Sequence, residues 1–487
     1  LRSTGSRCMT LTYILIFAAA AIPFMRLVPA RGRPWGLLAG SVLAMGWLQS
    51  ASEAAESTYL LPLATVILTI VVWWIVRPAA PEQPAPAEYR RDTWLALAIT
   101  GAALAVIWLL APYGDRPDLA ALLLGAALAG VAAISASHLL GERVPDERLA
   151  AFQRLAALAI GMIVLLLLVI KWPALSQALG GWLHAEPQIG IASFVTWLGF
   201  SYIAFRLIGV LLDFRAGQLP AEGFSLRDML VYTLFFPAFT AGPIDRAQRF
   251  IPELDQALPL DSFRLVEGTA RIAIGVFKKF VVADSPALVA MSPALIDQTD
   301  GIPGLWLLVY LYALQIFFDF SGYSDVAIGL GRLYGITLPE NFDRPYLQSN
   351  IQQFWNRWHI TLSLWFRVYF FTPLSRALLR RHISPTLGVF VAQISTMLLI
   401  GLWHGVTWNF ILWGLWHGLG LFLFKLWSDR TRMWYLNAAQ RPRVRRAITV
   451  FGVLVTFHFV ALGWVFFALP TPADSFEMLA RLFGIRG

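Results

Sequence analysis

His404 is the side chain best suited to acid–base chemistry, because it ends an apolar run that contains no other ionisable group. A neutral imidazole accepts and returns a proton near neutral pH, and the neighbouring glycines let a substrate approach the backbone closely. A lone histidine can equally be a hydrogen-bonded core residue, and His404 by itself supports both interpretations. His417 follows 13 residues later. In one continuous helix it would lie about 20 Å further along the axis, so we expect it to pack or line a tunnel outside the site.

His359 is a second candidate, and it ends the segment Phe354-Trp355-Asn356-Arg357-Trp358-His359. Trp365, Phe366 and Arg367 follow it. Aromatic and basic residues in alternation are typical of helices at the cytoplasmic membrane interface. The alternative is an aromatic and arginine belt in which His359 has no chemical role, and composition favours neither interpretation.

Five polar residues interrupt an apolar stretch further upstream: Asp319, Ser321, Tyr323, Ser324 and Asp325. A bare carboxylate costs several kcal/mol in hydrocarbon, so these side chains should face a bundle interior or a water-filled cavity. We interpret all but Ser324 as candidate substrate-binding residues. The alternative is that serine and aspartate cap helices or join them to one another.

Other catalytic classes lack a signature in this sequence. It contains no GxSxG, HExxH, P-loop or CxxC pattern, and Cys8 is its single cysteine. We therefore expect neither a serine or cysteine nucleophile nor a bound metal or cofactor. The net charge of +9 comes from arginines that fall mostly between apolar runs. There they set membrane orientation and contact anionic lipid, so we do not expect a nucleic-acid partner.

Composition identifies an all-α polytopic membrane protein. The chain has 487 residues, of which 58% are hydrophobic and 14% charged, against about 25% charged in soluble domains. Apolar runs long enough to cross a bilayer recur along it. The predicted spans are residues 11–28, 35–50, 59–76, 93–112, 118–140, 152–172, 190–213, 229–242, 266–292, 302–330, 384–404, 406–427 and 446–469. We expect about eleven true crossings, with the others re-entrant or interfacial.

The loop charges predict an orientation in a plasma (inner) membrane. Basic loops alternate with acidic or neutral ones from the first span onward. Because basic loops stay in the cytoplasm, we place the N-terminus outside. The same count places Arg332–His382 in the cytoplasm and His404 towards the outer half of the membrane. We expect residues 1–10, which lack an initiator Met, to be a leader or a remnant of cloning, and the first apolar run to be a retained helix.

The sequence resembles the membrane-bound O-acyltransferases (MBOAT), on its bacterial branch of alginate O-acetylase membrane subunits and the D-alanyl transfer proteins of teichoic acid synthesis. The matching segments are Phe236-Pro237, Ala241-Gly242-Pro243-Ile244-Asp245-Arg246, Gly275-Val276-Phe277-Lys278-Lys279, Asp319-Phe320-Ser321-Gly322-Tyr323-Ser324-Asp325, Glu340-Asn341-Phe342, Arg344-Pro345-Tyr346, Phe354–His359, Trp403-His404-Gly405 and Trp408. The resemblance implies N-terminal transmembrane helices over residues 11–228, a catalytic core over 229–470 and a tail over 471–487.

The resemblance also implies a ring of helices around a central tunnel, with His404 catalytic and His359 a second important residue nearer the cytoplasm. His404 would be the general base, and Trp403 and Trp408 would contact substrate. Asn356, Arg357 and Trp358 would help His359 to bind an acyl-CoA or acyl-carrier-protein thioester, whose phosphate a guanidinium suits. Many relatives carry an acid after the arginine of this region, where Val368 follows Arg367 here, so any role of that acid is in question.

The resulting hypothesis is an O-acyltransferase that moves an acyl group, in the simplest case acetyl, to hydroxyls of an extracytoplasmic polysaccharide, directly or through a periplasmic partner. D-alanyl transfer to teichoic acid is an alternative. A carrier or channel that moves the acyl group for a separate transferase is a second alternative, and a structural scaffold is a third. Loss of product on His404→Ala would favour the enzyme.

Overall fold

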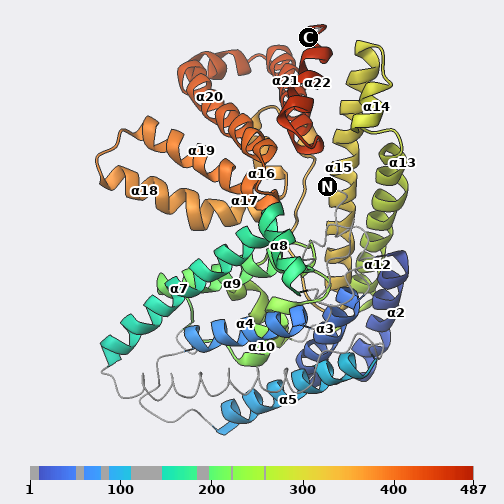
Figure 1. Ribbon diagram of the computed structural model, residues 1–487, viewed down its shortest axis with the longest axis vertical. Helices are drawn as coiled ribbons and strands as arrows, with labels where there is room; N and C mark the ends of the chain where they lie inside the picture. Colours follow the sequence, from blue (N-terminus) through green and yellow to red (C-terminus); the bar gives the residue numbers. More distant parts are fainter. Residues whose placement is uncertain are drawn as a thin grey trace. The chain divides into compact units, whose positions relative to one another are not determined.

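Helices make up all the regular structure in the part of the chain that the structure describes (Figure 1). The structure is a computed structural model, and it describes residues 10–50, 60–77, 87–110, 145–183, 197–220, 223–256 and 259–485. This confirms the predicted all-α class. The leader and the predicted span 118–140 lie outside the described residues, apart from Thr10.

Six described helices are long and apolar enough to cross a membrane, and they coincide with six of the predicted spans. They are Arg91–Leu109, Leu149–Lys171, Ile302–Leu333, Pro385–His404, Trp408–Ala439 and Pro442–Ala468. Two shorter apolar helices, Leu11–Leu27 and Leu61–Val76, accompany them. Together these helices define a multi-pass membrane protein, while the number of crossings stays a prediction.

The chain divides into two compact units. The first contains the described residues up to Arg271 together with Ala327–Leu338. Its elements are α2 (Leu11–Leu27), η1 (Ala30–Gly32), α3 (Arg33–Ser50), α4 (Leu60–Val76), α5 (Ala87–Leu110), α7 (Pro145–Lys171), α8 (Pro173–Leu183), α9 (Phe200–Arg215), α10 (Leu226–Leu234), α11 (Ala247–Gln256) and the first part of α12 (Ser262–Val276).

A buried arginine ends the helix that the sequence predicted as a span over 229–242. The helix α10 stops at Leu234, and the guanidinium of Arg206 donates to the carbonyl oxygens of Tyr232, Thr233 and Ala238 at 3.0–3.1 Å. These bonds satisfy carbonyls at the end of α10 and in the turn beyond it. The prediction of one continuous span here was therefore wrong.

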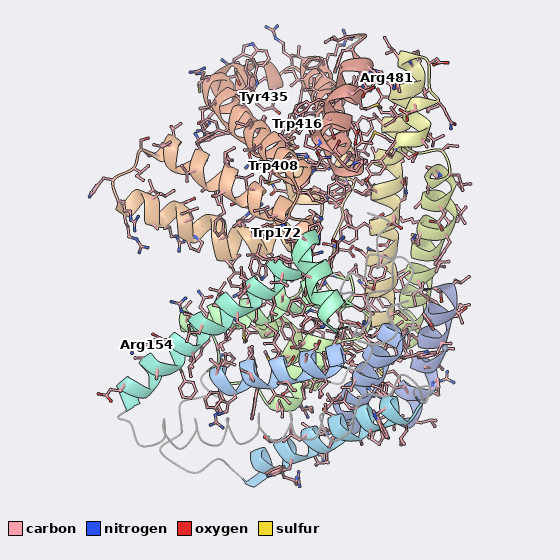
Figure 2. The ribbon with its side chains drawn as sticks, in the orientation of Figure 1. Arg154, Trp172, Trp408, Trp416, Tyr435 and Arg481 are labelled. Atoms are coloured by element: carbon pink, nitrogen blue, oxygen red, sulfur yellow. The ribbon has the colours of Figure 1, made fainter. Side chains whose placement is uncertain are left out.

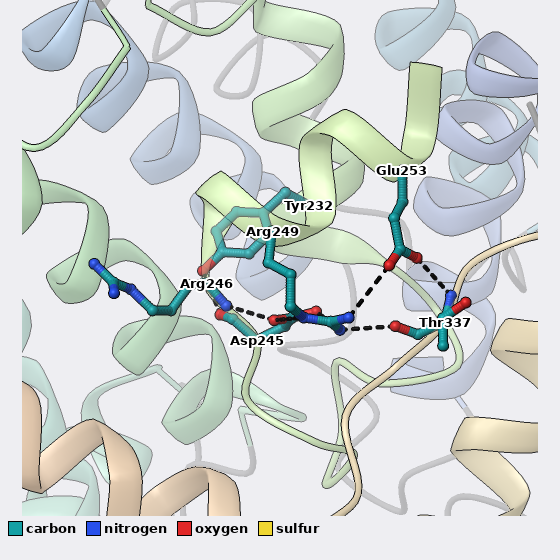
Figure 3. A network of polar contacts seen from close by, with 6 residues as sticks. All are labelled: Tyr232, Asp245, Arg246, Arg249, Glu253 and Thr337. Atoms are coloured by element: carbon teal, nitrogen blue, oxygen red, sulfur yellow. Dashed lines mark hydrogen bonds and ion pairs between the residues drawn. The ribbon is translucent and has the colours of Figure 1, made fainter. Parts of the chain in front are cut away.

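A polar network then fixes the chain between α10 and α11 (Figure 3). Asp245 accepts from Arg249, and its own carbonyl accepts from the Tyr232 hydroxyl at 2.8 Å. Arg249 also donates to the Thr337 carbonyl, while Glu253 accepts from the Thr337 amide, both at 2.7 Å. The network joins α11 to the segment that follows α15, and so holds the chain just before it enters the second unit.

The second unit contains Ile272–Val326 and the described residues from Pro339 onward. Its elements are the end of α12, the π-helix η4 (Phe277–Ala283), α13 (Asp284–Ala287), α14 (Pro293–Asp297), α15 (Ile302–Leu333, up to Val326), η5 (Pro345–Leu347), α16 (Ile351–Arg357), α17 (Ile360–Phe366), the π-helix η6 (Arg367–Phe371), α18 (Thr372–Arg380), α19 (Pro385–His404), α20 (Trp408–Ala439), α21 (Pro442–Ala468) and α22 (Pro472–Leu482). Because α12, η4 and α13 follow one another without a gap, the predicted span 266–292 is helical up to Ala287.

Helices α19 and α20 form an antiparallel pair held closely together by glycines (Figure 1). A Cβ atom on Gly401 would lie 2.2 Å from the carbonyl oxygen of Phe410, and one on Gly414 would lie 2.7 Å from that of Met397. Small residues at such contacts let membrane helices approach backbone to backbone. The glycines therefore determine the position of the residues at the C-terminal end of α19 relative to α20.

The helix is interrupted between His404 and His417, so the assumption of one continuous helix there was wrong. Helix α19 ends at His404, Gly405 is extended, and Thr407 precedes the first residue of α20. A Cβ on Gly405 would lie 2.8 Å from the Phe410 ring, which explains why glycine suits the turn. The two histidines consequently stand on two facing helices.

Candidate active site

His404 lies in a box of aromatic rings at the turn between α19 and α20. Its ring centroid is 4.6 Å from Trp403, 4.8 Å from Phe467, 5.6 Å from Trp413 and 5.8 Å from Phe410. The imidazole is half-buried. A box of this kind fixes the ring plane while leaving part of the imidazole accessible, as a general base requires.

Trp403 contacts both predicted histidines. The indole centroid is 4.6 Å from the ring of His404 and 6.2 Å from the ring of His359. Long-range folding thus brings two residues that are 45 positions apart in sequence into contact with the same side chain. Their arrangement suits a donor group and an acceptor group that meet at this point.

His359 is held in an unusual backbone conformation. It precedes α17 with φ of 43°, in the left-handed region, and its side chain is 2% exposed. This conformation costs a non-glycine residue about 1–2 kcal/mol. The surrounding contacts must supply that energy, and they include edge-to-face packing on Phe320 at 4.7 Å.

Asn341 determines which nitrogen of His359 carries the proton. The Oδ1 atom of Asn341 accepts from the Thr361 amide and hydroxyl at 3.3 and 2.8 Å, while its Nδ2 donates to the Ser324 hydroxyl at 3.1 Å. Because an amide N–H only donates, these bonds fix the orientation of the asparagine side chain. The Nδ1 atom of His359, 3.1 Å from the same Oδ1, must then donate. Its Nε2 is therefore the basic nitrogen.

His359 is neutral in this environment. Burial lowers the pKa of its imidazole from 6.5 to about 3, because the charged form loses its hydration. A neutral ring with Nδ1 protonated can accept a hydrogen bond or a proton through Nε2. This protonation state suits contact with a neutral polar group of a substrate.

The other residues predicted near His359 face two different ways. Trp358 is 5% exposed and packs among Phe354, Trp464 and neighbouring rings. Asn356 and Arg357 are exposed, and both are paired, Asn356 accepting from Arg367 and Arg357 forming an ion pair with Asp343. Trp358 is thus a core residue here, whereas the pair before it presents polar groups at the surface.

Trp408 is separated from the aromatic box. It begins α20 and is 72% exposed, and Figure 2 marks it with Trp416 along the same helix. The ring that contacts His404 from this end of α20 is Phe410. A role for Trp408 in binding substrate would therefore have to be at the entrance to the site.

The acids on α15 are paired with lysines. Asp325 lies 2.6 Å from Lys278, and Asp319 lies 2.6 Å from Lys279, both on the π-helix η4. Ion pairs of this kind make charged groups tolerable beside hydrocarbon, which supports the structural interpretation of the two acids. Ser321 is buried and Tyr323 half-buried on the same helix.

Sequence reasoning missed the residues that orient the two histidines. Asn341, which is fully buried, was noted only inside a matching segment, and Trp413 and Phe467 were not considered. The sequence gives no signal for Asn341, because charged residues such as Glu340 and Asp343 flank it and its burial cannot be read from its neighbours. Nothing in the sequence alone connects Phe467 to His404.

His417 is closer to His404 than predicted. Both imidazoles contact Trp413, at centroid distances of 5.6 Å for His404 and 4.9 Å for His417. The earlier separation of about 20 Å assumed a continuous helix, and the break at Gly405 removes that assumption. His417 and the candidate base His404 therefore share one neighbouring ring, that of Trp413.

Residues 150–466 match the membrane-bound O-acyltransferase family. The match covers most of the second unit, including both histidines and, from the aromatic box, Trp403, Phe410 and Trp413. The chain belongs to the membrane-bound O-acyltransferase family, and it is an O-acyltransferase.

The curated relatives act on different polymers. The chain is 34% identical over 300 residues to a teichoic acid D-alanyltransferase of Streptococcus thermophilus, and the aligned region covers 58% of this chain and 71% of the relative. It is 37% identical over 288 residues to a probable alginate O-acetylase of Azotobacter vinelandii, covering 59% and 53%. It is 35% identical over 275 residues to a peptidoglycan O-acetyltransferase of Helicobacter pylori, covering 55% and 49%. The chain thus spans about half the length of the two acetyl-transferring relatives.

Proposed function

We propose that this protein transfers an acetyl group from a pantetheine thioester to hydroxyl groups of a polysaccharide on the outer side of the plasma membrane. The donor would be acyl-CoA or an acyl carrier protein on the cytoplasmic side. The acceptor would arrive from the other side, directly or through a periplasmic partner transferase. The observation that carries the proposal is the contact of both histidines with Trp403.

The reaction needs one proton transfer in each direction. His404 removes the proton of the acceptor hydroxyl as its oxygen attacks the thioester carbonyl carbon. The tetrahedral intermediate then collapses, the carbon–sulfur bond breaks, and the imidazolium returns the proton to the leaving thiolate. Positioned general-base catalysis of this kind contributes about 10²–10⁴-fold in rate.

His359 would contact the donor side of the reaction. Its protonated Nδ1 donates a hydrogen bond to Asn341, so the basic Nε2 is the nitrogen that could contact a neutral group of the acyl donor. Asn356 and Arg357 lie at the exposed end of α16, where they could meet a phosphate of the donor. The exposure of this segment supports an entry route on the side that the loop charges predict to be cytoplasmic.

D-alanyl transfer to teichoic acid is a second candidate. One observation favours it, because the chain covers 71–73% of two teichoic acid D-alanyltransferases but about half of the acetyltransferases. The chemistry at His404 would be the same. The released acid distinguishes the two candidates, since one yields acetate and the other D-alanine.

The test compares alkali-labile esters on surface polymers of cells that carry the unmodified protein, His404→Ala, His382→Asn or an empty vector. His382 is an exposed histidine with φ of 58° outside the site, and asparagine tolerates that conformation, so His382→Asn is a matched control. We expect esters with the unmodified protein and the control, and a loss of at least 100-fold with His404→Ala at equal protein level. Equal ester with His404→Ala would instead favour an acyl carrier or channel without chemistry of its own.

A further inference from the structure

His417 is a buried histidine whose ring nitrogens both lack a hydrogen-bond partner among the described residues. Its side chain is 0% exposed. It projects from α20 towards α21, because a Cβ on Gly463 would lie 2.8 Å from its Nε2 atom. A buried polar group without a partner costs about 1–3 kcal/mol, and most native proteins avoid it.

Two tryptophans beside His417 share this property. Trp355 and Trp413 are 7% and 1% exposed, and within the part of the chain that the structure describes the Nε1 atom of each has no hydrogen-bond partner. The three rings contact one another, with centroids 4.9 Å apart for Trp413 and His417, 5.2 Å for Trp355 and His417, and 5.8 Å for Trp355 and Trp413. We call this group the His417 triad.

The composition of the triad selects the chemistry of a ligand. An indole N–H can only donate, and a neutral imidazole donates from one nitrogen. The other rings around His417 are aromatic, namely Phe459 and Trp464. A neutral oxygen that accepts hydrogen bonds suits this environment, whereas an unpaired ion would be costly in it. The matching group is a carbonyl oxygen.

The triad is connected to both candidate reaction residues. Trp413 contacts His404 at 5.6 Å, and Trp355 belongs to α16, the helix that ends just before Trp358 and His359. We propose that the His417 triad binds the thioester carbonyl oxygen of the acyl donor's pantetheine arm. This inference rests on the proposed acyl transfer, and it assigns three donor-binding residues to that reaction.

Thermal shifts with two matched compounds test the inference. S-acetylpantetheine carries the arm common to CoA and carrier proteins, and S-ethylpantetheine lacks only its thioester oxygen. With the protein in lipid nanodiscs, we expect the acetyl compound to raise the melting temperature more than the ethyl compound. In His417→Leu and Trp413→Phe that difference should vanish, and half-maximal stabilisation by the acetyl compound should need about fivefold more of it.

The control is Trp416→Phe on the same helix (Figure 2). The Trp416 indole already donates to the Phe459 carbonyl at 2.9 Å, so its loss should lower stability without changing the difference between the two compounds. His417→Leu should melt no lower than the unmodified protein without ligand, because it removes two unpaired nitrogens.

Three results would overturn the inference. They are no shift with either compound at millimolar concentration, an undiminished difference in His417→Leu, and a large loss of unliganded stability in that variant, which would indicate an internal water or a structural role. Ester formation in cells is measured separately with His404→Ala. If cells form esters while the compounds behave in any of these three ways, the inference fails and the proposed function stands.

Discussion

Gly401→Ala should inactivate the protein by moving the base, although it adds only one methyl group. Gly401 lies one turn before His404 on α19, and its added Cβ would lie 2.2 Å from the Phe410 carbonyl oxygen. Ordinary contacts between heavy atoms begin more than 3 Å apart, so the two backbones must separate by about 1 Å. Phe410 stacks on His404 at 5.8 Å, and the separation would open the aromatic box.

The expected magnitude follows from that displacement. A misplacement of about 1 Å at a reacting group costs roughly 100-fold in rate, and overpacking of this kind costs about 1–3 kcal/mol in stability. Activity should therefore fall much more than the amount of folded protein. The assay is ester formation per unit of protein, with melting temperature measured on the same samples.

Gly388→Ala provides the matched comparison on the same helix. A Cβ there would meet Leu378 at 3.7 Å, an ordinary contact, and alanine favours the helix by about 0.5–1 kcal/mol. This variant should keep full activity and melt at the same or a higher temperature. If Gly401→Ala were as active as Gly388→Ala, the argument that close helix packing positions His404 would be wrong.

Three further predictions concern the ion pairs, the neutral histidine and the orientation. Lys278→Met should destabilise the protein by about 3 kcal/mol, because it leaves the Asp325 carboxylate buried without that lysine. The double variant with Asp325→Leu should recover most of the lost melting temperature, and no recovery would contradict the pairing argument. Burial lowers the pKa of His359 to about 3, so between that pH and about 6.5 the unfolded state binds one proton more than the folded state. The free energy of unfolding should therefore be at its full value above pH 6.5 and fall by about 1.4 kcal/mol per pH unit below it. The difference in melting temperature between pH 7.5 and pH 5 should be smaller in His359→Asn than in the unmodified protein, and equal differences would refute the assignment. The orientation is tested by labelling introduced cysteines in a variant without the native cysteine. A membrane-impermeant maleimide applied to intact spheroplasts should label Trp408→Cys, at a 72% exposed position, but should label His382→Cys only after the membrane is broken. The reverse pattern would invert the proposed orientation.

The sequence by itself determined the class of protein. Continuous apolar runs such as 302–330 and 446–469 leave few alternatives to membrane helices, because hydrocarbon cannot satisfy exposed backbone groups. The residue types also singled out His404 and His359 as candidate site residues, since an imidazole in such surroundings is rare, and their roles stay a prediction. These features are local, and local features can be read along a chain.

Tertiary structure decided how those residues are used. Asn341 sets the protonated nitrogen of His359 from 18 positions away, and Phe467 contacts His404 across 63 positions. The aspartates of α15 meet lysines more than 35 positions upstream. Hydropathy reports only the cost of leaving a group alone in hydrocarbon, and it cannot say which distant group will meet it. The glycine at position 405 is of the same kind, because only the close packing of the Phe410 ring, 2.8 Å from where a Cβ would lie, requires a residue without a side chain there.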